Sequence, residues 1–214
     1  MKSISNTKSL VLLGLLTALV AVFSFTIIGS IPIGPLVITL NVIPVAIAAV
    51  SMGPAGGAII GGVFGIFSFL QCFSIGTPSL MGIALLEETG SPLLCFLQRF
   101  LPRLIDGLLV GLLFNLLSKK FDVRISCAIT GFCAALFNTL LFMSSLVIAF
   151  GSTEYMKNSM AGKSFIAYIV ASISVNAIFE MIAATVVTGA VGYALYKAKL
   201  ITVNSSKVKA GKAA

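Results

Sequence analysis

The chain has 214 residues, of which 58% are hydrophobic and 9% are charged, and its mean hydropathy is +1.13. Soluble domains carry about 25% charged residues, so a water-soluble fold is excluded. The net charge of +8 does not indicate nucleic-acid binding, because the basic residues cluster at the ends of apolar segments. No histidine occurs, and the four cysteines lack metal-ligand spacing. The sequence therefore predicts no metal site, no cofactor and no histidine-based catalysis.

Six apolar segments predict an all-α membrane protein with six transmembrane helices. A spanning helix needs about 20 apolar residues. Strands are not expected, because the runs are continuously apolar rather than alternating. The membrane domain is expected to cover residues 1–201, and the basic, polar tail of residues 202–214 is expected to be disordered. The predicted helices lie at residues 9–28, 36–53, 55–71, 92–117, 126–150 and 164–197.

The distribution of Lys and Arg predicts that both ends of the chain lie in the cytoplasm. Most basic residues fall near the two termini and around Lys119, whereas the outer loops hold only Lys157 and Lys163. On this orientation, residues 29–35 and 72–91 are outer connections. The glycines and prolines of residues 29–35 favour a defined turn, and long structured loops are usually functional. We expect the two connections to cover an outward-facing pocket.

Small residues predict where helices approach closely. Gly57, Gly61 and Gly65 recur every fourth residue and form a flat ridge along one helix face. Gly107 and Gly111 repeat this spacing in the fourth segment. In lipid, close packing through small residues is a main source of helix association. These glycines are therefore interpreted as internal packing positions.

Four ionisable residues lie inside predicted helices, where each costs a few kcal/mol and needs a partner or a purpose. Arg103 and Asp106 are three residues apart and can pair. Glu180 is expected to find its donor in Arg103 or in a neighbouring asparagine, so these three residues are interpreted as a structural charge network. Arg99 has no such acid nearby in the sequence. It is expected either to meet an anionic ligand group or to extend towards water.

Uncharged polar residues at outer or middle depth are candidates for a shared pocket. Amides and hydroxyls can recognise a vitamin-sized ligand through hydrogen bonds, and the 16 phenylalanines can supply an apolar wall. Each amide taken alone can equally serve an interhelical hydrogen bond. The candidates are Asn41, Gln71, Gln98, Asn138, Tyr168 and Asn176.

Several motifs resemble the substrate-binding S components of energy-coupling factor (ECF) vitamin transporters. They are residues 31–34 (IPIG), residues 43–44 (IP) and the glycine-rich residues 51–68. The resemblance covers nearly the whole chain. Residues 68–73 (SFLQCF), the pair Pro102 and Arg103, and residues 137–139 (FNT) further resemble the pantothenate-type subgroup. The resemblance implies a multi-pass protein of the bacterial cell membrane that captures a water-soluble vitamin or precursor, with pantothenate the first candidate.

The resemblance also implies partners and site residues. S components work with a transmembrane T component and two ATPases, and this chain has no phosphate-binding loop of its own. No enzymatic activity is expected. The family lid corresponds to residues 31–35, and the implied ligand contacts are Gln71, Arg99, Asn138 and Tyr168. The family docks its T component through an Ala-x-x-x-Ala surface on the first helix. Its counterparts here are Gly14, Thr17, Ala18 and Ala21, of which the first two depart from alanine.

Three alternatives remain open at this level. The vitamin can be riboflavin, hydroxymethylpyrimidine or folate, and a neutral ligand would remove the argument for Arg99 as an anion contact. An ion-coupled secondary transporter would use Asp106 and Glu180, but such proteins usually show paired halves, and no internal repeat is evident. An intramembrane enzyme fits least, because histidine is absent and no two carboxylates are closely spaced.

Overall fold

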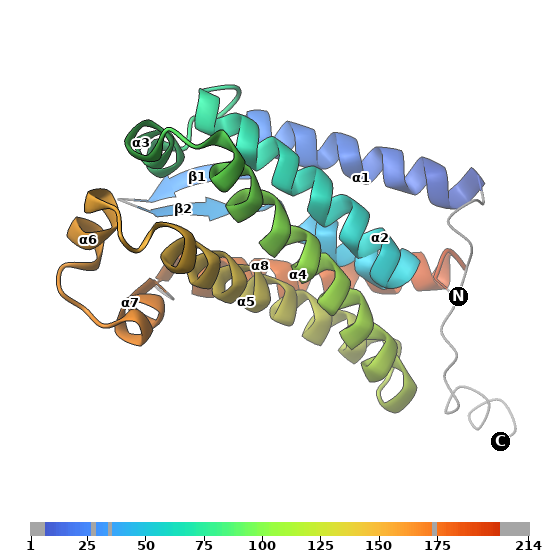
Figure 1. Cartoon of the computed structure of the whole chain (residues 1–214). Coiled ribbons are helices and arrows are strands. Elements are labelled where there is room, and N and C mark those ends of the chain that lie inside the picture. Colours follow the sequence, from blue (N-terminus) through green and yellow to red (C-terminus); the bar gives the residue numbers. More distant parts are fainter. Residues whose placement is uncertain (1–6, 27–28, 34–35, 173–174, 202–214) are drawn as a thin grey trace, which may run out of the picture.

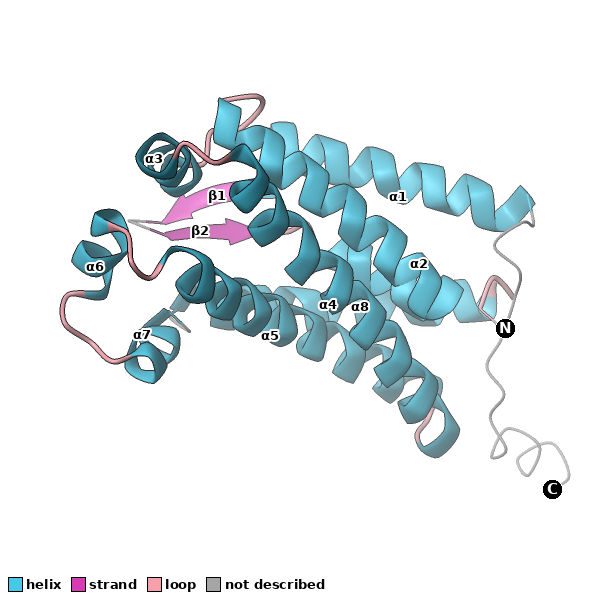
Figure 2. Cartoon of the chain, in the orientation of Figure 1, coloured by secondary structure: helices cyan, strands magenta, loops and turns pink. Residues whose placement is uncertain are grey.

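A computed structural model describes residues 7–26, 29–33, 36–172 and 175–201, without the side chains of residues 30–38, 165, 169 and 171–176. Long helices form a bundle that carries a β-hairpin and short helices at one end (Figures 1 and 2). The predicted tail of residues 202–214 lies outside the described residues. The elements are α1 (Thr7–Phe25), β1 (Ser30–Ile33), β2 (Leu36–Thr39), α2 (Val42–Leu70), the 3-10 turn η2 (Gln71–Phe73), α3 (Leu80–Thr89), α4 (Pro92–Lys120), α5 (Val123–Phe150), α6 (Glu154–Met160), α7 (Phe165–Ser172) and α8 (Val175–Lys197).

Helix α2 is folded back on itself at Gly53. This residue has φ 75° and ψ −162°, a left-handed conformation that glycine adopts readily, and Pro54 follows it. Asn41, before the helix, and Gln71, after it, both hydrogen bond to Ser24. A straight helix of 29 residues would hold its ends about 43 Å apart. The first limb (residues 42–52) and the second limb (residues 54–70) are therefore antiparallel.

The described residues contain five helices long and apolar enough to cross a membrane, namely α1, α2, α4, α5 and the greater part of α8. Because α2 has two limbs, there are six candidate membrane segments. The predicted turn between residues 53 and 55 is confirmed. The structure is all-helical in these segments, as the composition indicates.

One expectation about secondary structure is wrong. Residues 36–39 form strand β2, paired antiparallel with β1 so that Ser30 faces Thr39, and α2 begins only at Val42. The β-branched residues of this stretch favour an extended backbone, and a pair of strands satisfies part of its own hydrogen bonding. The helix predicted at residues 164–197 corresponds to the helices α7 and α8, and residues 173–174 between them lie outside the described part of the chain.

The predicted glycine ridge is confirmed as a contact between the second limb of α2 and α4. A Cβ atom on Gly57 would strike the carbonyl oxygen of Gly107, and one on Gly61 would strike that of Arg103. A Cβ atom on Gly65 would lie 2.7 Å from the α4 backbone. The two helix backbones are thus in direct contact, which only glycine permits. This contact, here called the α2–α4 seam, holds α4 in place against the second limb of α2.

The two ends of the bundle differ in charge. The β-hairpin and helices α3, α6 and α7 lie at one end, here called the capped end, and the start of α1 and the end of α8 lie towards the other, the basic end (Figure 1). The capped end carries residues of both signs, including Glu87, Glu88 and Lys157. The basic end has an excess of Lys and Arg, which is the pattern of a cytoplasmic face. Its described basic residues are Lys8, Lys119, Lys120, Arg124, Lys197 and Lys199.

Candidate functional site

One face of helix α4 that packs inside the bundle carries charged residues. Arg99, Arg103 and Asp106 follow one another at spacings of four and three residues, so they lie on one helix face. Only 5%, 6% and 2% of their respective surfaces are exposed. We call these three residues the α4 ladder. The opposite face, which includes Leu101 and Leu112, is apolar and exposed, as expected for a surface in contact with lipid.

Arg99 is enclosed beneath α3. Its Nη1 donates to the hydroxyl of Ser68 (3.4 Å), and its Nη2 donates to the hydroxyl of Ser79 (3.1 Å). Gly82 packs so closely that a Cβ atom there would lie 2.7 Å from Nη2. The sequence places no acid near Arg99, and the structure shows its guanidinium held by two neutral hydroxyls. Its head is buried and does not extend to the surface.

Arg103 lies between two aromatic rings. Its guanidinium carbon is 4.4 Å from the ring centre of Phe64 and 4.6 Å from that of Phe142, both within cation–π range. Nη1 donates to the backbone oxygen of Arg99 (2.9 Å). The Nε atom is buried and has no hydrogen-bond partner. The aromatic rings thus hold the side chain and leave one donor unused.

Asp106 is the most deeply buried member of the ladder. Its Oδ1 has no hydrogen-bond partner, and no hydrogen bond joins it to Arg103 within the described part of the chain. Direct pairing, which the three-residue spacing favours, is therefore not formed. The aromatic contacts of Arg103 with Phe64 and Phe142 explain why its side chain is held elsewhere. The ladder accordingly contains an unpaired donor and an unpaired acceptor.

Glu180 on α8 has a partner that its sequence position does not indicate. Its Oε1 accepts from the backbone N–H of Thr39 (2.5 Å) and from the Thr39 hydroxyl (3.1 Å). The expected donors were Arg103 or a neighbouring asparagine. The two residues are 141 positions apart, so no local spacing rule could have paired them. This contact attaches the β-hairpin to α8.

Ser24, which sequence reasoning missed, is a structural junction. It is fully buried at the end of α1. Asn41 Nδ2 donates to its hydroxyl (3.2 Å), and Gln71 Nε2 donates to its backbone oxygen (2.9 Å). The side chains of two predicted ligand contacts, Asn41 and Gln71, are thus engaged at Ser24. A serine within an apolar helix is too common a feature to have signalled this role.

The remaining candidates are spread over the capped half of the bundle. Gln98 and Asn138 are buried, and Gln98 Nε2 has no partner. Tyr168 is half-buried and packs against an apolar cluster that includes Leu85 and Met156. The side chain of Asn176 lies outside the described residues, as do residues 34 and 35 of the expected lid.

Helices α3 and α6 form one rigid cap. Both carboxylate oxygens of Glu88 on α3 accept hydrogen bonds at the start of α6, from the N–H groups of Glu154 (2.6 Å) and Tyr155 (3.1 Å). A carboxylate at a helix N-terminus satisfies free donors and opposes the helix dipole. Beneath this contact lies an apolar cluster formed by Leu85, Cys95, Leu146, Phe150 and Met156. This cluster seats the cap on the ends of α4 and α5.

Comparison with known proteins identifies the family. Residues 8–192 match the ECF transporter substrate-specific component family. The chain belongs to this family. It is also similar to the pantothenate transporter PanT of Leuconostoc mesenteroides subsp. mesenteroides, with 29% identity over 173 residues that cover 78% of this chain and 81% of the relative. An ECF S component is a membrane transport protein and not an enzyme, so both expectations from the sequence are confirmed.

In this S component, the expected docking face of α1 is open. A Cβ atom on Gly14 would meet nothing within 4 Å, and Ala18 is exposed. The face that packs against the bundle carries the buried Leu16 and Val20. The other two predicted docking residues, Thr17 and Ala21, are both partly buried.

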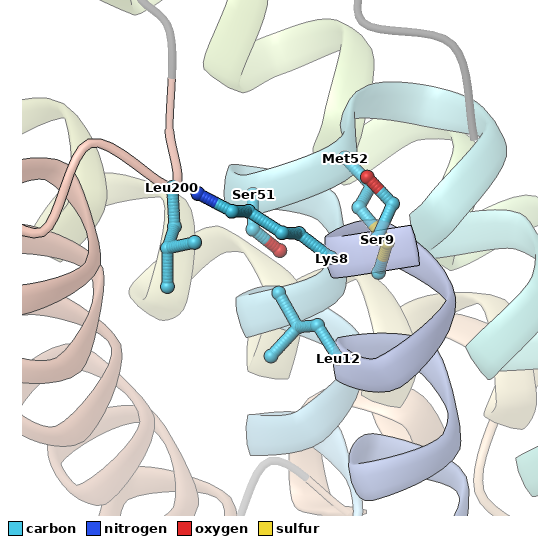
Figure 3. Close-up of a pocket in the computed structure, with 6 residues that line it drawn as sticks. All are labelled: Lys8, Ser9, Leu12, Ser51, Met52 and Leu200. Carbon is cyan, nitrogen blue, oxygen red and sulfur yellow. The ribbon is translucent and has the colours of Figure 1, made fainter. Parts of the chain in front are cut away.

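The S component also has a small hollow at its basic end (Figure 3). Its volume is about 10 Å³, which at most suits one water molecule. It is therefore no candidate for a vitamin-sized ligand. Its lining residues are Lys8, Ser9, Leu12, Ser51, Met52 and Leu200.

Proposed function

We propose that this S component binds pantothenate at the α4 ladder and presents it for ATP-driven uptake. The similarity to a pantothenate transporter supports the choice of ligand. The observation that carries the proposal is the environment of Arg99. Its guanidinium is buried, and its side-chain hydrogen bonds go to two serine hydroxyls and to no carboxylate in the described part of the chain.

A buried cation without an anionic partner is energetically costly. Its planar fork matches a carboxylate, and such charged hydrogen bonds are roughly twice as strong as neutral ones. Pantothenate carries one carboxylate. In the proposed complex this carboxylate binds Arg99, while Ser68 and Ser79 hold the guanidinium in position.

Partners supply the energy for uptake. As an ECF S component, the chain is expected to associate with a T component and two ATPases. We place the T component on the open face of α1, around Gly14 and Ala18. We also place the capped end outside the cell, because the basic end fits the cytoplasmic side.

The test is equilibrium binding by the purified S component. Pantothenate should bind more tightly than about 10 µM, which corresponds to roughly −6.8 kcal/mol. Panthenol, in which an alcohol replaces the carboxylate, should bind at least tenfold more weakly. Arg99→Gln should remove most of this preference. The matched control is Arg124→Gln, since Arg124 lies at the basic end against Tyr193 and should not affect the preference.

A vitamin panel separates the alternatives. Riboflavin and hydroxymethylpyrimidine lack a carboxylate, so tight binding of either without pantothenate would contradict the proposal. Folate carries two carboxylates. Tight binding of folate alone would contradict pantothenate as the ligand, even if Arg99 proved to be the carboxylate contact.

A further inference from the structure

We propose that Asp106 is a specificity residue that accepts a hydrogen bond from a substrate hydroxyl. The substrate then lies along α4 with its carboxylate at Arg99 and its hydroxyl-bearing end at Asp106. This inference rests on the proposed function and adds to it the orientation of the ligand and the recognition of its second end.

The first support is the pair of unpartnered atoms. Asp106 Oδ1 and Arg103 Nε are both buried, and neither has a hydrogen-bond partner. Buried polar atoms in native proteins almost always have one, and an unpaired group costs about 1–3 kcal/mol. One of these atoms is an acceptor and the other a donor. A ligand that fits both must offer a donor and an acceptor, which a hydroxylated amide does.

The second support is distance. Arg99 and Asp106 are seven residues apart, which is about 10.5 Å along the helix axis at 1.5 Å per residue. In pantothenate, eight bonds separate the carboxylate carbon from the terminal hydroxyl oxygen. Since three chain bonds span about 3.3–3.6 Å when extended, this molecule reaches about 9–10 Å. The length of the ligand is therefore comparable with the separation of Arg99 and Asp106 along the helix axis.

The third support is the surface between these ends. Arg103 stands midway, and its Nε donates to the substrate amide carbonyl in the proposed complex. The ring of Phe142 lies 5.3 Å from the Arg99 guanidinium carbon and 4.6 Å from that of Arg103. An apolar ring along the middle of the ladder suits the methyl groups of the substrate.

Glu180 is the only other buried carboxylate among the described residues. Its Oε1 already accepts two hydrogen bonds from Thr39. Asp106 has an oxygen without any partner. The recognition of a hydroxyl is therefore assigned to Asp106.

The experiment compares the wild type and two Asp106 variants in their binding of two ligands that differ in one hydroxyl. The wild type, Asp106→Asn and Asp106→Ala are titrated with pantothenate and with an analogue that has hydrogen in place of the terminal hydroxyl. The wild type should prefer pantothenate by about tenfold to a hundredfold, the range for a hydrogen bond to a charged group. Asp106→Asn keeps an amide oxygen that can accept, so it should reduce the preference only to the severalfold expected of a neutral hydrogen bond. Asp106→Ala removes the acceptor and should abolish the preference, while binding of the analogue stays almost unaffected.

Two controls make the outcome decisive. Thermal unfolding checks that both Asp106 variants are folded. Glu180→Gln should not alter the preference between the two ligands. If Asp106→Asn weakens both ligands equally, or if the wild type does not distinguish them, Asp106 does not read the hydroxyl. Failure of the wild type to bind pantothenate at all would refute the proposed function itself.

Discussion

Glu180 on α8 and Thr39 on β2 are joined by two hydrogen bonds, one from the Thr39 backbone N–H at 2.5 Å and one from its hydroxyl at 3.1 Å. The other elements of the capped end are held differently. Helices α3 and α6 pack on an apolar cluster shared with α4 and α5, and the Glu88 contact joins them. The two bonds from Thr39 go to a carboxylate, and bonds of this kind are worth about 1.5–3 kcal/mol each, so they contribute substantially to the attachment of the hairpin to α8.

Loss of the Glu180 acceptor should therefore speed ligand release. Glu180→Ala should raise the dissociation rate of pantothenate by about tenfold or more, since both bonds to Thr39 disappear. Stopped-flow displacement by excess ligand measures this rate. Glu180→Gln keeps an acceptor oxygen and should lie near the wild type. An unchanged rate in Glu180→Ala would show that these bonds do not hold the hairpin over the site.

The seam between α2 and α4 should not tolerate a side chain. Gly61→Ala places a Cβ atom against the carbonyl oxygen of Arg103, and overpacking of this kind costs about 1–3 kcal/mol. Thermal unfolding in detergent should show a lower midpoint. Gly14→Ala is the matched control, because nothing lies within 4 Å of its Cβ position. Equal midpoints for the two variants would contradict the close contact.

A bulky residue on the open face of α1 should separate complex formation from ligand binding. Ala18→Trp should reduce the amount of T component that copurifies with the S component, because it fills the flat surface around Gly14. Pantothenate affinity should stay within twofold of the wild type, since Ala18 is exposed and remote from the α4 ladder. Undiminished copurification would refute this docking face.

Transport should require the partners. Proteoliposomes that contain the S component alone should not accumulate pantothenate under a proton or sodium gradient. Addition of the T component and the ATPases with ATP should restore uptake. Concentrative uptake by the chain alone would instead support the ion-coupled alternative, with Asp106 and Glu180 as coupling residues.

Features encoded by local spacing were predictable from the sequence. The apolar segments, the turn at Gly53 and the spacing of Gly57 and Gly61 all follow from composition and helix geometry. The pairing of Thr39 with Glu180 was not predictable, because it joins distant positions. The spacing of Arg103 and Asp106 was misleading in one respect: it allows a hydrogen bond, but the two aromatic rings at Arg103 hold the side chain elsewhere.

The fold-back of α2 bears on how the protein is made. At 1.5 Å per residue, its first limb measures about 16 Å, and its second, which continues through η2 to Phe73, measures about 30 Å. The first limb is shorter than the roughly 30 Å hydrocarbon core of a bilayer, so it is too short to insert as an independent span during synthesis. It is therefore expected to leave the translocation machinery together with the second limb, as a preformed hairpin with Gly53 at its tip.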